Sequence, residues 1–470
     1  MNRILILLII NTLAGCSVGN EYKSNDFLSQ TEIQETLKIS NTDTPITHNW
    51  FEIFNDKDLN TLLKHATNSN FSIKQGIERL KQSRLQYMIK SKSYYPMINS
   101  QNNYSFSKSN DATNISSNVN NFRVGFDFSW EIDIWGKGKY TSEQYYQLLK
   151  NAQYSIANIK VMIISEIILN YIELRSSQEK LNIANKNLSL QNAILDTIKG
   201  KYNSGIETEL ALSHANFVTE KTKQLIPEYK SQIEQYKNAI ATLLGVLPQN
   251  LPINLEKTDN NITSKNFKYS VKKLQKLPLN IIQTRPDIVI AETNIKKQNA
   301  IVNQAIADLY PDVNLDMAFG FMNTSGSSLF NTQSQLYSYT PEIYIPIWNW
   351  GQLKNNIELQ KSIKEEYLLN YNEAVLTALI EIKTAMIAIE EAYNQNKYAT
   401  NALNQMKNIL DLTKNKYENG LIEFSELAKA EQNLLDAQNT LIDSNANIIK
   451  NITAFYKATG GGYNIYENYL

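Results

Sequence analysis

The feature that most constrains this chain is that its sequence repeats once along its length. Four landmarks recur in order, each displaced by 215 residues: Tyr95-Pro96 as Tyr310-Pro311, Trp135-Gly136 as Trp350-Gly351, Tyr202-Asn203-Ser204-Gly205 as Tyr417-Glu418-Asn419-Gly420, and Gly245 as Gly460. One displacement without a net gap predicts two copies of a single structural unit, at residues 60–245 and 275–460. Residues 246–274 are rich in Pro and Asn, which indicates an irregular connector, and residues 461–470 are expected to form a C-terminal tail.

Each unit is expected to contain one very long helix and a helix that returns alongside it. Between Gly351 and Gly420 the chain has neither Gly nor Pro, and its apolar residues recur at helical spacing. A helix of that length would extend roughly 100 Å, which is typical of coiled coils and of barrels assembled from them. The first unit follows the same plan, with Pro227 expected to kink its return helix. Shorter helices are expected near 60–92 and 286–308.

Two segments between these helices have the period of a β-strand. Residues 122–131 and 313–322 carry an apolar side chain at every second position, with mostly polar residues between them. Strands of about ten residues with this alternation are typical of a membrane-spanning barrel that has a wet lumen. Weaker strands are expected at 98–106 and 336–347, each joined to its partner by a polar loop. The alternative is a pair of soluble hairpins that cap a helical protein.

Four strands cannot close a barrel on their own. An open sheet edge in lipid leaves backbone groups unpaired, and each such group costs on the order of several kcal/mol. A barrel therefore requires several copies of the chain. Three copies would supply twelve strands, although the sequence alone does not exclude four.

The N-terminus has the pattern of an export signal. Arg3 precedes the short apolar run 4–10, and Leu13-Ala14-Gly15-Cys16 follows. This pattern predicts a signal peptide at residues 1–15 that is removed. Leu-Ala-Gly-Cys resembles a bacterial lipobox, which implies that Cys16 becomes the first residue and receives the lipid, and that residues 16–59 form an N-terminal periplasmic segment. Ser17 favours the outer membrane over retention at the inner membrane. The alternative is an ordinary signal peptide with an accidental cysteine.

The composition excludes several other classes of protein. Lys and Arg together number 46 and so do Asp and Glu, and no basic patch with interleaved aromatics occurs, so nucleic acid is not an expected partner. None of the three histidines has a second ligand at metal-binding spacing. No nucleophile elbow, phosphate loop or dinucleotide motif is present. We therefore expect no enzyme activity, no metal and no cofactor.

Taken in order, several motifs resemble the outer-membrane efflux factor family, the TolC-like proteins. The motifs that carry the resemblance are Trp130-Glu131-Ile132-Asp133-Ile134-Trp135-Gly136, Arg285-Pro286-Asp287-Ile288, Ala291-Glu292, Tyr310-Pro311, Pro346-Ile347-Trp348-Asn349-Trp350-Gly351 and the two Tyr-x-x-Gly turns. The resemblance implies a mainly helical homotrimer, in which a twelve-stranded transmembrane barrel continues into a long α-helical barrel. It also implies a passive exit duct in the outer membrane that docks with a periplasmic adaptor and an inner-membrane pump, with the lipobox favouring the drug- and metal-efflux branch and an RND-type pump.

The same resemblance implies where the duct closes. In the family the two helical hairpins turn over at the periplasmic tip, and the turns Tyr202-x-x-Gly205 and Tyr417-x-x-Gly420 match those positions. Tyr417 falls on the family's gate tyrosine and Glu426 on its upper acidic position. The lower acidic position is Lys429 here, and Ile422 replaces a basic partner of the tyrosine, so the gate network differs from that of the founding member.

The acidic residues near the tip suggest a cation-sensitive mouth. Three copies of Glu426 around a narrow axis would repel one another, and burial with like charge would raise their pKa values. Glu423 lies one helical turn away and is expected to share the mouth. Glu207 and Glu209 belong to the other tip and are expected to be solvated.

Glu131 and Asp133 stand where a strand meets a helix. The strand period places them on one face, so a hydrated, lumen-facing position is expected. The favoured interpretation is a structural junction with no role in transport, in which Gly136 and Gly138 relieve the bend.

Two other functions are consistent with the pattern. One is a type I secretion duct that passes unfolded proteins. The second is a structural coiled-coil lipoprotein that never inserts into a membrane. The sequence does not name the cargo.

Overall fold

The computed structural model describes residues 18–23, 27–37, 50–110, 116–256 and 281–462. The predicted signal peptide and the lipid-attachment residue Cys16 lie outside these residues, as do most of the predicted C-terminal tail and the second half of the connector.

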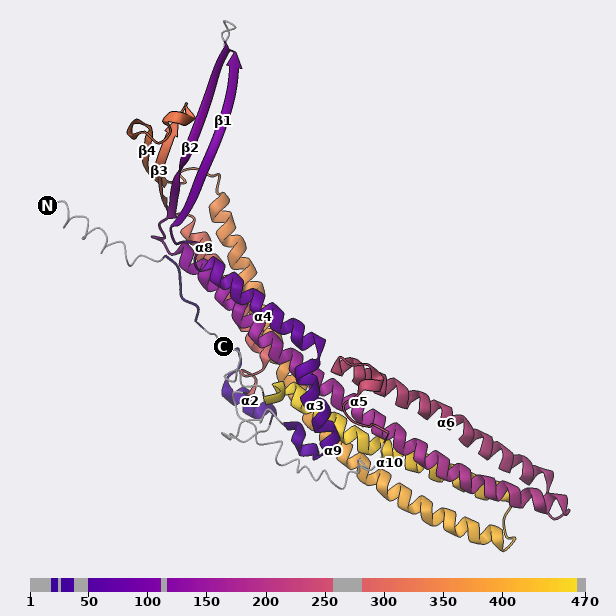
Figure 1. Ribbon diagram of the computed structural model, residues 1–470. Coiled ribbons are helices and arrows are strands. Elements are labelled where there is room, and N and C mark those ends of the chain that lie inside the picture. The colour runs from indigo at the N-terminus through magenta and orange to yellow at the C-terminus, as the bar shows by residue number, and fades with distance from the viewer. Residues whose placement is uncertain (1–17, 24–26, 38–49, 111–115, 257–280, 463–470) are drawn as a thin grey trace. The chain divides into compact units, whose positions relative to one another are not determined.

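The described chain is mainly helical, with four strands (Figure 1). The helices are α2 (Gln30–Leu37), α3 (Lys57–Ser69), α4 (Phe71–Lys90), α5 (Lys137–Asn203), α6 (Glu209–Leu244), α8 (Pro286–Ala307), α9 (Gln352–Glu418) and α10 (Phe424–Ala458). The strands are β1 (Met97–Asn110), β2 (Ser116–Glu131), β3 (Asp312–Asn323) and β4 (Gln335–Tyr344). Short 3-10 helices are η1 (Trp50–Phe54), η2 (Pro248–Asn250), η5 (Gly326–Ser328), η6 (Thr332–Ser334) and η7 (Gly460–Gly462).

The two long helices have the lengths and positions that the sequence predicts. α5 and α9 each contain 67 residues, and both of their ends are displaced by 215 residues. α6 remains one helix across Pro227, the site of the expected kink. Pro227 has no amide hydrogen, so one backbone hydrogen bond of the helix is missing at this position. The buried apolar face of α6 nevertheless continues on both sides of Pro227.

The described chain divides into two compact units, and each takes segments from both halves of the sequence. The first unit is Met1–Asn25, Arg79–Ala152 and Ile290–Tyr371, and the second is Asp26–Glu78, Gln153–Val289 and Asn372–Leu470. The sequence repeat therefore does not coincide with the division into compact units.

The first unit contains a single antiparallel sheet in the order β1-β2-β3-β4. β1 with β2 and β3 with β4 form the two expected hairpins, and β2 pairs with β3, which joins the two halves of the chain. Gly125 faces Gly320 across that central pairing. A Cβ at Gly125 would lie only 2.6 Å from the carbonyl oxygen of Phe319, so the close approach of these two strands requires glycine.

Three strand boundaries differ from the sequence-based expectation by three residues or more. β1 ends at Asn110 rather than at residue 106. β2 begins at Ser116, six residues before the apolar alternation starts, because its polar first residues still pair with the end of β1. β4 ends at Tyr344 rather than at residue 347. Pro346 follows and cannot donate a hydrogen bond to a ladder, which explains the earlier end.

The second unit is held by a helical core. Its largest fully buried side chains include Tyr171, Ile167 and Leu174 of α5, Ile240 of α6 and Phe455 of α10. Burial of each such side chain contributes roughly 1.5–3 kcal/mol. The rings of Trp50 and Tyr456 stack with their centroids 4.5 Å apart, which attaches η1 to the end of α10.

One described helix, α5, contains an 18-residue window with a mean hydropathy of 1.4, which is long and apolar enough to cross a membrane. However, 56% of that window is buried inside the protein. The window therefore behaves as part of a packed core helix, and we assign it no membrane span.

Candidate functional site: the two hairpin tips

Both long helices end in the same hydrogen-bonded turn. Gly205 and Gly420 adopt a left-handed conformation with φ of 71°. The amide of Gly205 donates to the carbonyl of Tyr202, and the next amide donates five residues back, to Lys201. Gly420 and Leu421 repeat these two bonds at the end of α9. This is the Schellman motif, and it explains the Tyr-x-x-Gly pattern, because the glycine must stand in the left-handed position three residues after the tyrosine.

The return helices begin differently in the two halves. Thr208 caps α6, and its side-chain oxygen accepts a hydrogen bond of 3.2 Å from the amide of Ala211. Glu423 occupies the equivalent position before α10 and makes no side-chain cap. The Glu423 carboxylate is therefore available to line the space between the two tips.

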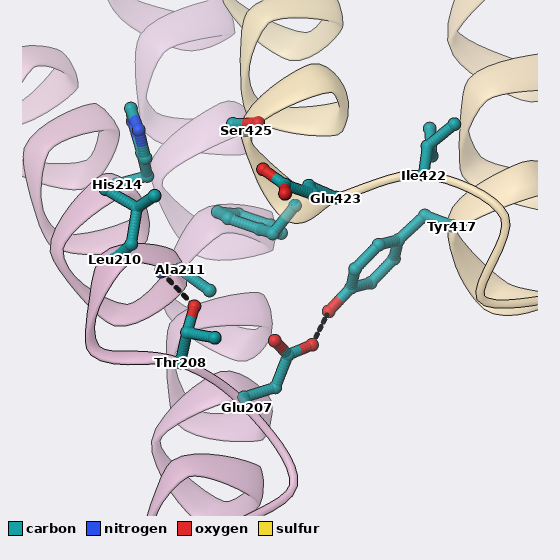
Figure 2. Close-up of a pocket in the computed structure, with 10 residues that line it drawn as sticks. Glu207, Thr208, Leu210, Ala211, His214, Tyr417, Ile422, Glu423 and Ser425 are labelled. Atoms are coloured by element: carbon teal, nitrogen blue, oxygen red, sulfur yellow. Dashed lines mark hydrogen bonds between the residues drawn. The ribbon is translucent and has the colours of Figure 1, made fainter.

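A single hydrogen bond joins the two tips directly. The hydroxyl of Tyr417 donates to Oε1 of Glu207 over 2.8 Å, as Figure 2 shows. The Tyr417 ring packs edge-on against Phe424 with centroids 5.7 Å apart, and Nζ of Lys201 lies 5.3 Å from its centroid. Tyr417 is thus in contact with α5, with the turn before α6 and with its own hairpin.

The environment keeps Tyr417 protonated. Burial, followed by the hydrogen bond and the negative charge of Glu207, raises the pKa of Tyr417 to about 12. The hydroxyl therefore remains a donor throughout the physiological range.

A small cavity of about 290 Å³ lies beside this bond. It is lined by residues of both tips: Glu207, Thr208, Leu210, Ala211, His214, Tyr417, Ile422, Glu423, Phe424 and Ser425. An apolar cluster supports the two tips, and its buried members are Ile198, Ala211, Ala215, Val218, Phe424, Leu427 and Ala428. This packing fixes the separation of the two hairpins and so brings Tyr417 within reach of Glu207.

The predicted tip residues are only partly brought together. Tyr417 and Glu423 line the cavity, whereas Glu426 is exposed in the first turn of α10 and does not line it. Tyr202 is exposed on the other tip. Glu207, expected to be solvated, is half-buried and accepts the hydrogen bond from Tyr417. The one available signal was Ile422, which stands where the resemblance implies a basic partner for Tyr417, so that the tyrosine needs a partner elsewhere.

The junction between β2 and α5 is held by charge. Oδ2 of Asp133 accepts a hydrogen bond of 3.0 Å from the amide of Lys139, near the start of α5. Nζ of Lys137 lies 3.3 Å from Asp308, 3.6 Å from Asp312 and 3.7 Å from Glu131. Burial alone would lower the pKa of Lys137, but these three carboxylates together raise it. Both predicted junction residues therefore take part in local structural contacts.

Trp135 of the same junction makes a contact that the sequence alone did not reveal. Its ring stacks on Tyr310 with centroids 4.8 Å apart, and its Nε1 donates to the carbonyl of Pro311 over 2.8 Å. Trp135 and the Tyr-Pro pair come from different halves of the chain. The contact therefore joins the two repeats where they meet in the first unit.

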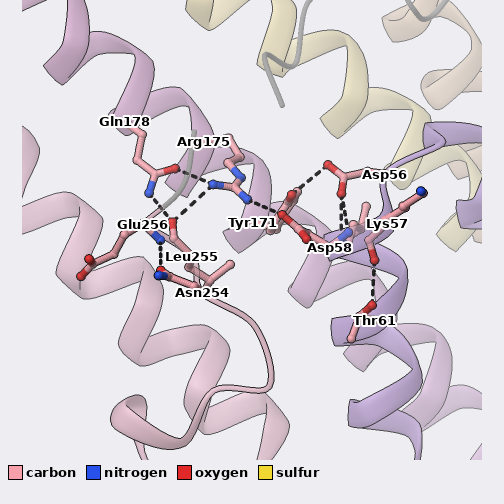
Figure 3. Close-up of polar contacts among 11 residues, drawn as sticks. Asp56, Lys57, Asp58, Thr61, Tyr171, Arg175, Gln178, Asn254, Leu255 and Glu256 are labelled. Carbon is pink, nitrogen blue, oxygen red and sulfur yellow. Dashed lines mark hydrogen bonds and ion pairs between the residues drawn. The ribbon is translucent and has the colours of Figure 1, made fainter. Parts of the chain in front are cut away.

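A second polar cluster lies in the second unit (Figure 3). The hydroxyl of Tyr171 donates to Asp56 over 2.8 Å, and Arg175 binds Asp58 over 3.0 Å. Arg175 and Gln178 also donate to the carbonyl of Leu255. Burial, with the charge of Asp56, raises the pKa of Tyr171. The cluster attaches α3 and the start of the connector to α5, so we assign it a structural role.

Among the residues that the structure describes, no group of His, Cys, Asp and Glu could hold a metal ion. The tips offer polar contacts around a cavity lined by both hairpins.

Comparison with known proteins identifies the family. Residues 62–246 and 277–461 both match the sequence profile described as outer membrane efflux protein. This chain belongs to the outer membrane efflux protein family. The resemblance inferred from the motifs is therefore confirmed, and so is the expected combination of long helices with four strands.

Several members of the outer membrane efflux protein family align over most of their length. The cation efflux system protein CusC of Escherichia coli strain K12 is 25% identical over 98% of this chain and 99% of its own. The toluene efflux pump outer membrane protein TtgI of Pseudomonas putida is 24% identical over 89% and 88%.

Solved structures show the same fold. The outer-membrane channel OprN has a TM-score of 0.85 at 23% identity, covering 95% of this chain and 99% of its own. The Campylobacter jejuni CmeC outer membrane channel also has a TM-score of 0.85 at 23% identity, covering 96% of both chains.

Proposed function

We propose that this protein is the outer-membrane channel of a tripartite efflux system. Three copies form a barrel through the outer membrane, and their helices extend the duct into the periplasm. A periplasmic adaptor and an inner-membrane pump of the RND type deliver the cargo. The duct is passive and contains no motor, so the partner pump supplies direction.

The open sheet is the observation that carries this proposal. β1 and β4 lie at the two edges, and neither has a strand partner on its outer side among the described residues. Unpaired backbone groups in lipid cost several kcal/mol each, so edges of about ten residues cannot remain open there. Three copies of a four-stranded sheet supply twelve strands, an even number within the range of closed outer-membrane barrels.

We propose small molecules or metal cations as the cargo class. The names of these relatives support this choice, since CusC belongs to a cation efflux system and TtgI to a toluene efflux pump. We further propose that Cys16 carries the lipid anchor, consistent with SilC of Salmonella typhimurium, which is named a probable outer membrane lipoprotein and is 24% identical.

At the periplasmic end we propose that the two tips form the gate. Gly205 and Gly420 shape the turns, and Tyr417 holds the tips together through Glu207. The carboxylates of Glu423 and Glu426 belong to the mouth, where three copies would face one axis. Tyr202 stands at the matching position of the other tip, while Glu131 and Asp133 belong to the junction above the helices.

Electrical recording of the purified full-length lipoprotein in a planar lipid bilayer tests the channel. We expect discrete conductance steps that need neither nucleotide nor pump, because the duct has no motor. A strain that lacks the gene should become sensitive to a subset of dyes, detergents, antibiotics or metal salts, and the intact gene should restore growth. Purified protein that binds lipid but never conducts would exclude the proposal.

A further inference from the structure

A buried arginine joins the two helices of the second hairpin, which consists of α9 and α10. Arg285 stands just before α8, and its side chain is only 8% exposed. Its Nη1 donates over 2.6 Å to the carbonyl of Ala458, the last residue of α10, and lies 2.9 Å from Oε2 of Glu381 in α9. Its Nε and Nη2 donate to the carboxylate of Asp287 over 3.0 and 2.6 Å. One guanidinium therefore holds the long helix and the return helix of the same hairpin.

The first repeat has an uncharged residue at the position of Arg285. That residue is Asn70, and its Nδ2 donates to the carbonyl of Leu243 over 2.6 Å. Leu243 is the counterpart of Ala458 in the repeat. In both repeats, therefore, a side chain at this position satisfies a carbonyl at the end of the return helix, where the helix itself supplies no donor. The cap is a shared feature of the two hairpins.

The contact with the long helix belongs to the second hairpin. The counterpart of Glu381 is Glu166 in α5, which is exposed and makes no ion pair with any residue that the structure describes. The amide of Asn70 also carries no charge that could attract Glu166. The ion pair between Arg285 and Glu381 is thus an addition to the shared cap, and it lies in the hairpin that carries Tyr417.

The long helix connects this ion pair to the tip. Glu381 lies near the middle of α9, whereas Tyr417 lies at its end. At a rise of about 1.5 Å per residue, the segment 381–417 is roughly 54 Å long. If this segment tilted as a rod by about 2° at Glu381, its far end would move by roughly 2 Å. That displacement is enough to break a hydrogen bond of 2.8 Å such as the one between Tyr417 and Glu207.

We propose that Arg285 is a positioning residue for the gate, which holds α9 through Glu381 in the orientation in which Tyr417 reaches Glu207. This inference rests on the proposed channel function and deepens it, because it names the restraint on the second hairpin. When the ion pair separates, the bond to Ala458 still holds α10, so α9 can shift relative to α10. The Glu381 side chain is 49% exposed, so salt weakens the restraint.

The restraint can be removed without removing the cap. E381Q takes away the charge that Arg285 binds and leaves the bond to Ala458 in place. The matched control is E166Q, the same change at the exposed counterpart position of the first hairpin. We expect E381Q to raise the open probability of the full-length lipoprotein in a planar bilayer about threefold, since half-exposed ion pairs contribute modestly. We expect E166Q to leave the open probability unchanged.

The role of Arg285 itself is tested by R285N, which installs the residue of the first repeat. We expect R285N to raise the open probability as much as E381Q does, because both variants lose the same ion pair. An open probability that stays at the natural value in E381Q, or in R285N, overturns the proposal. A rise in E166Q equal to that in E381Q overturns it as well, because the restraint would then not belong to the second hairpin.

A double variant separates positioning from a general loss of stability. If the ion pair acts through the bond between Tyr417 and Glu207, E381Q has nothing further to release once Y417F has removed that bond. We expect the double variant to lie within about 1.5-fold of Y417F alone, since two changes in one coupled path are not additive. A full gain of about threefold in the Y417F background shows that the pair acts elsewhere, and overturns the proposal.

Hydrogen exchange provides a measurement that does not depend on conductance. We expect E381Q, but not E166Q, to speed exchange of the amides in the turn 417–421 about threefold, because the tip opens locally more often. Unchanged exchange at the tip overturns the restraint and leaves the channel proposal standing. A natural protein that never conducts overturns the channel proposal, whereas faster exchange confined to E381Q would still support the restraint on α9.

Discussion

At the residue scale, Tyr417 explains how two hairpins from different halves of the chain are held together. Its hydroxyl reaches Glu207, its ring packs on Phe424, and Lys201 lies against the same ring. A hydrogen bond to a charged acceptor contributes about 1.5–3 kcal/mol when it is buried, and less when it is half-exposed as here. A contribution near 1 kcal/mol per copy is enough to bias a gate without locking it.

Removal of this hydroxyl should favour the open tip. We expect Y417F to raise the open probability of the channel by about fivefold for each copy that loses about 1 kcal/mol. The matched control is Y202F, the same change at the equivalent position of the other tip, where the side chain is exposed. Single-channel recording compares the two variants, and equal effects would argue against the bond with Glu207 as the closing contact.

A second residue near the tips should make stability depend on pH. Burial raises the pKa of the Glu431 carboxyl to about 7, and Lys414 opposes part of that rise. A carboxyl with a raised folded-state pKa binds protons more tightly in the folded protein. Its contribution to stability is therefore fully present below the unfolded pKa and is lost as the pH rises through 7.

We expect E431Q to be more stable than the natural protein at pH 8 by on the order of 1–2 kcal/mol, since partial exposure screens some of the effect. The difference should disappear at pH 3.5, below the unfolded pKa of a Glu carboxyl of about 4.3. Urea unfolding at the two pH values measures it, with E426Q as a control at an exposed position of the same helix. A gain in stability that is the same at both pH values would contradict a raised pKa at Glu431.

At the element scale, the glycine at each hairpin turn is required by backbone conformation rather than by lack of space. A Cβ at Gly205 or at Gly420 would meet no atom within 4 Å, so space does not require glycine there. The positive φ does, because an L-residue in the left-handed region is less stable by about 1–2 kcal/mol.

A comparison of Gly205, in the turn after α5, with Gly200, inside α5, separates the effect of backbone conformation from that of space. We expect G205A to weaken the tip by about 1 kcal/mol, which would speed hydrogen exchange of the tip amides about fivefold. Gly200 lies five residues earlier inside α5 and is also free of neighbours, but its φ is helical, so G200A should stabilise the helix by up to about 1 kcal/mol. Hydrogen exchange that responds alike to both changes would contradict the argument.

Much of the element plan could be predicted, because it depends on local patterns. Long segments without Gly or Pro predicted the two long helices, and the alternation of apolar and polar residues predicted β2 and β3. The limits of β1, β2 and β4 depend on which strand lies opposite, so composition missed the polar start of β2. The bond between Tyr417 and Glu207 was missed for the same reason, since it joins residues 210 apart in sequence. Lipid attachment at Cys16 stays a prediction.

At the scale of the whole molecule, function depends on what several copies do around one axis. A single copy of Glu426 is an ordinary exposed carboxylate. Three copies near a narrow mouth would concentrate negative charge and attract cations. The proposed mouth is therefore a property of the assembly, and the isolated chain gives no sign of it.

The proposed ring of three Glu426 carboxylates can be tested in the assembled channel. We expect divalent cations to block the natural channel and E426A to weaken that block by roughly tenfold, because each lost carboxylate removes part of the local charge. Conductance in planar bilayers with and without a divalent salt measures the effect. E209A, at an exposed carboxylate of the other tip, is the control. If divalent cations block the E426A channel as strongly as the natural one, the Glu426 ring is not part of the gate.

The open outer edge of β1 also bears on how copies of the protein assemble. A folded copy that has not yet assembled carries two open sheet edges. Eight of the fourteen residues of β1 are Asn or Ser, which have low or neutral strand propensity, and Lys108 adds a charge. Chance pairing along this edge is therefore weak. We therefore expect productive pairing to require a sister copy that is aligned with β1 over the full length of the strand.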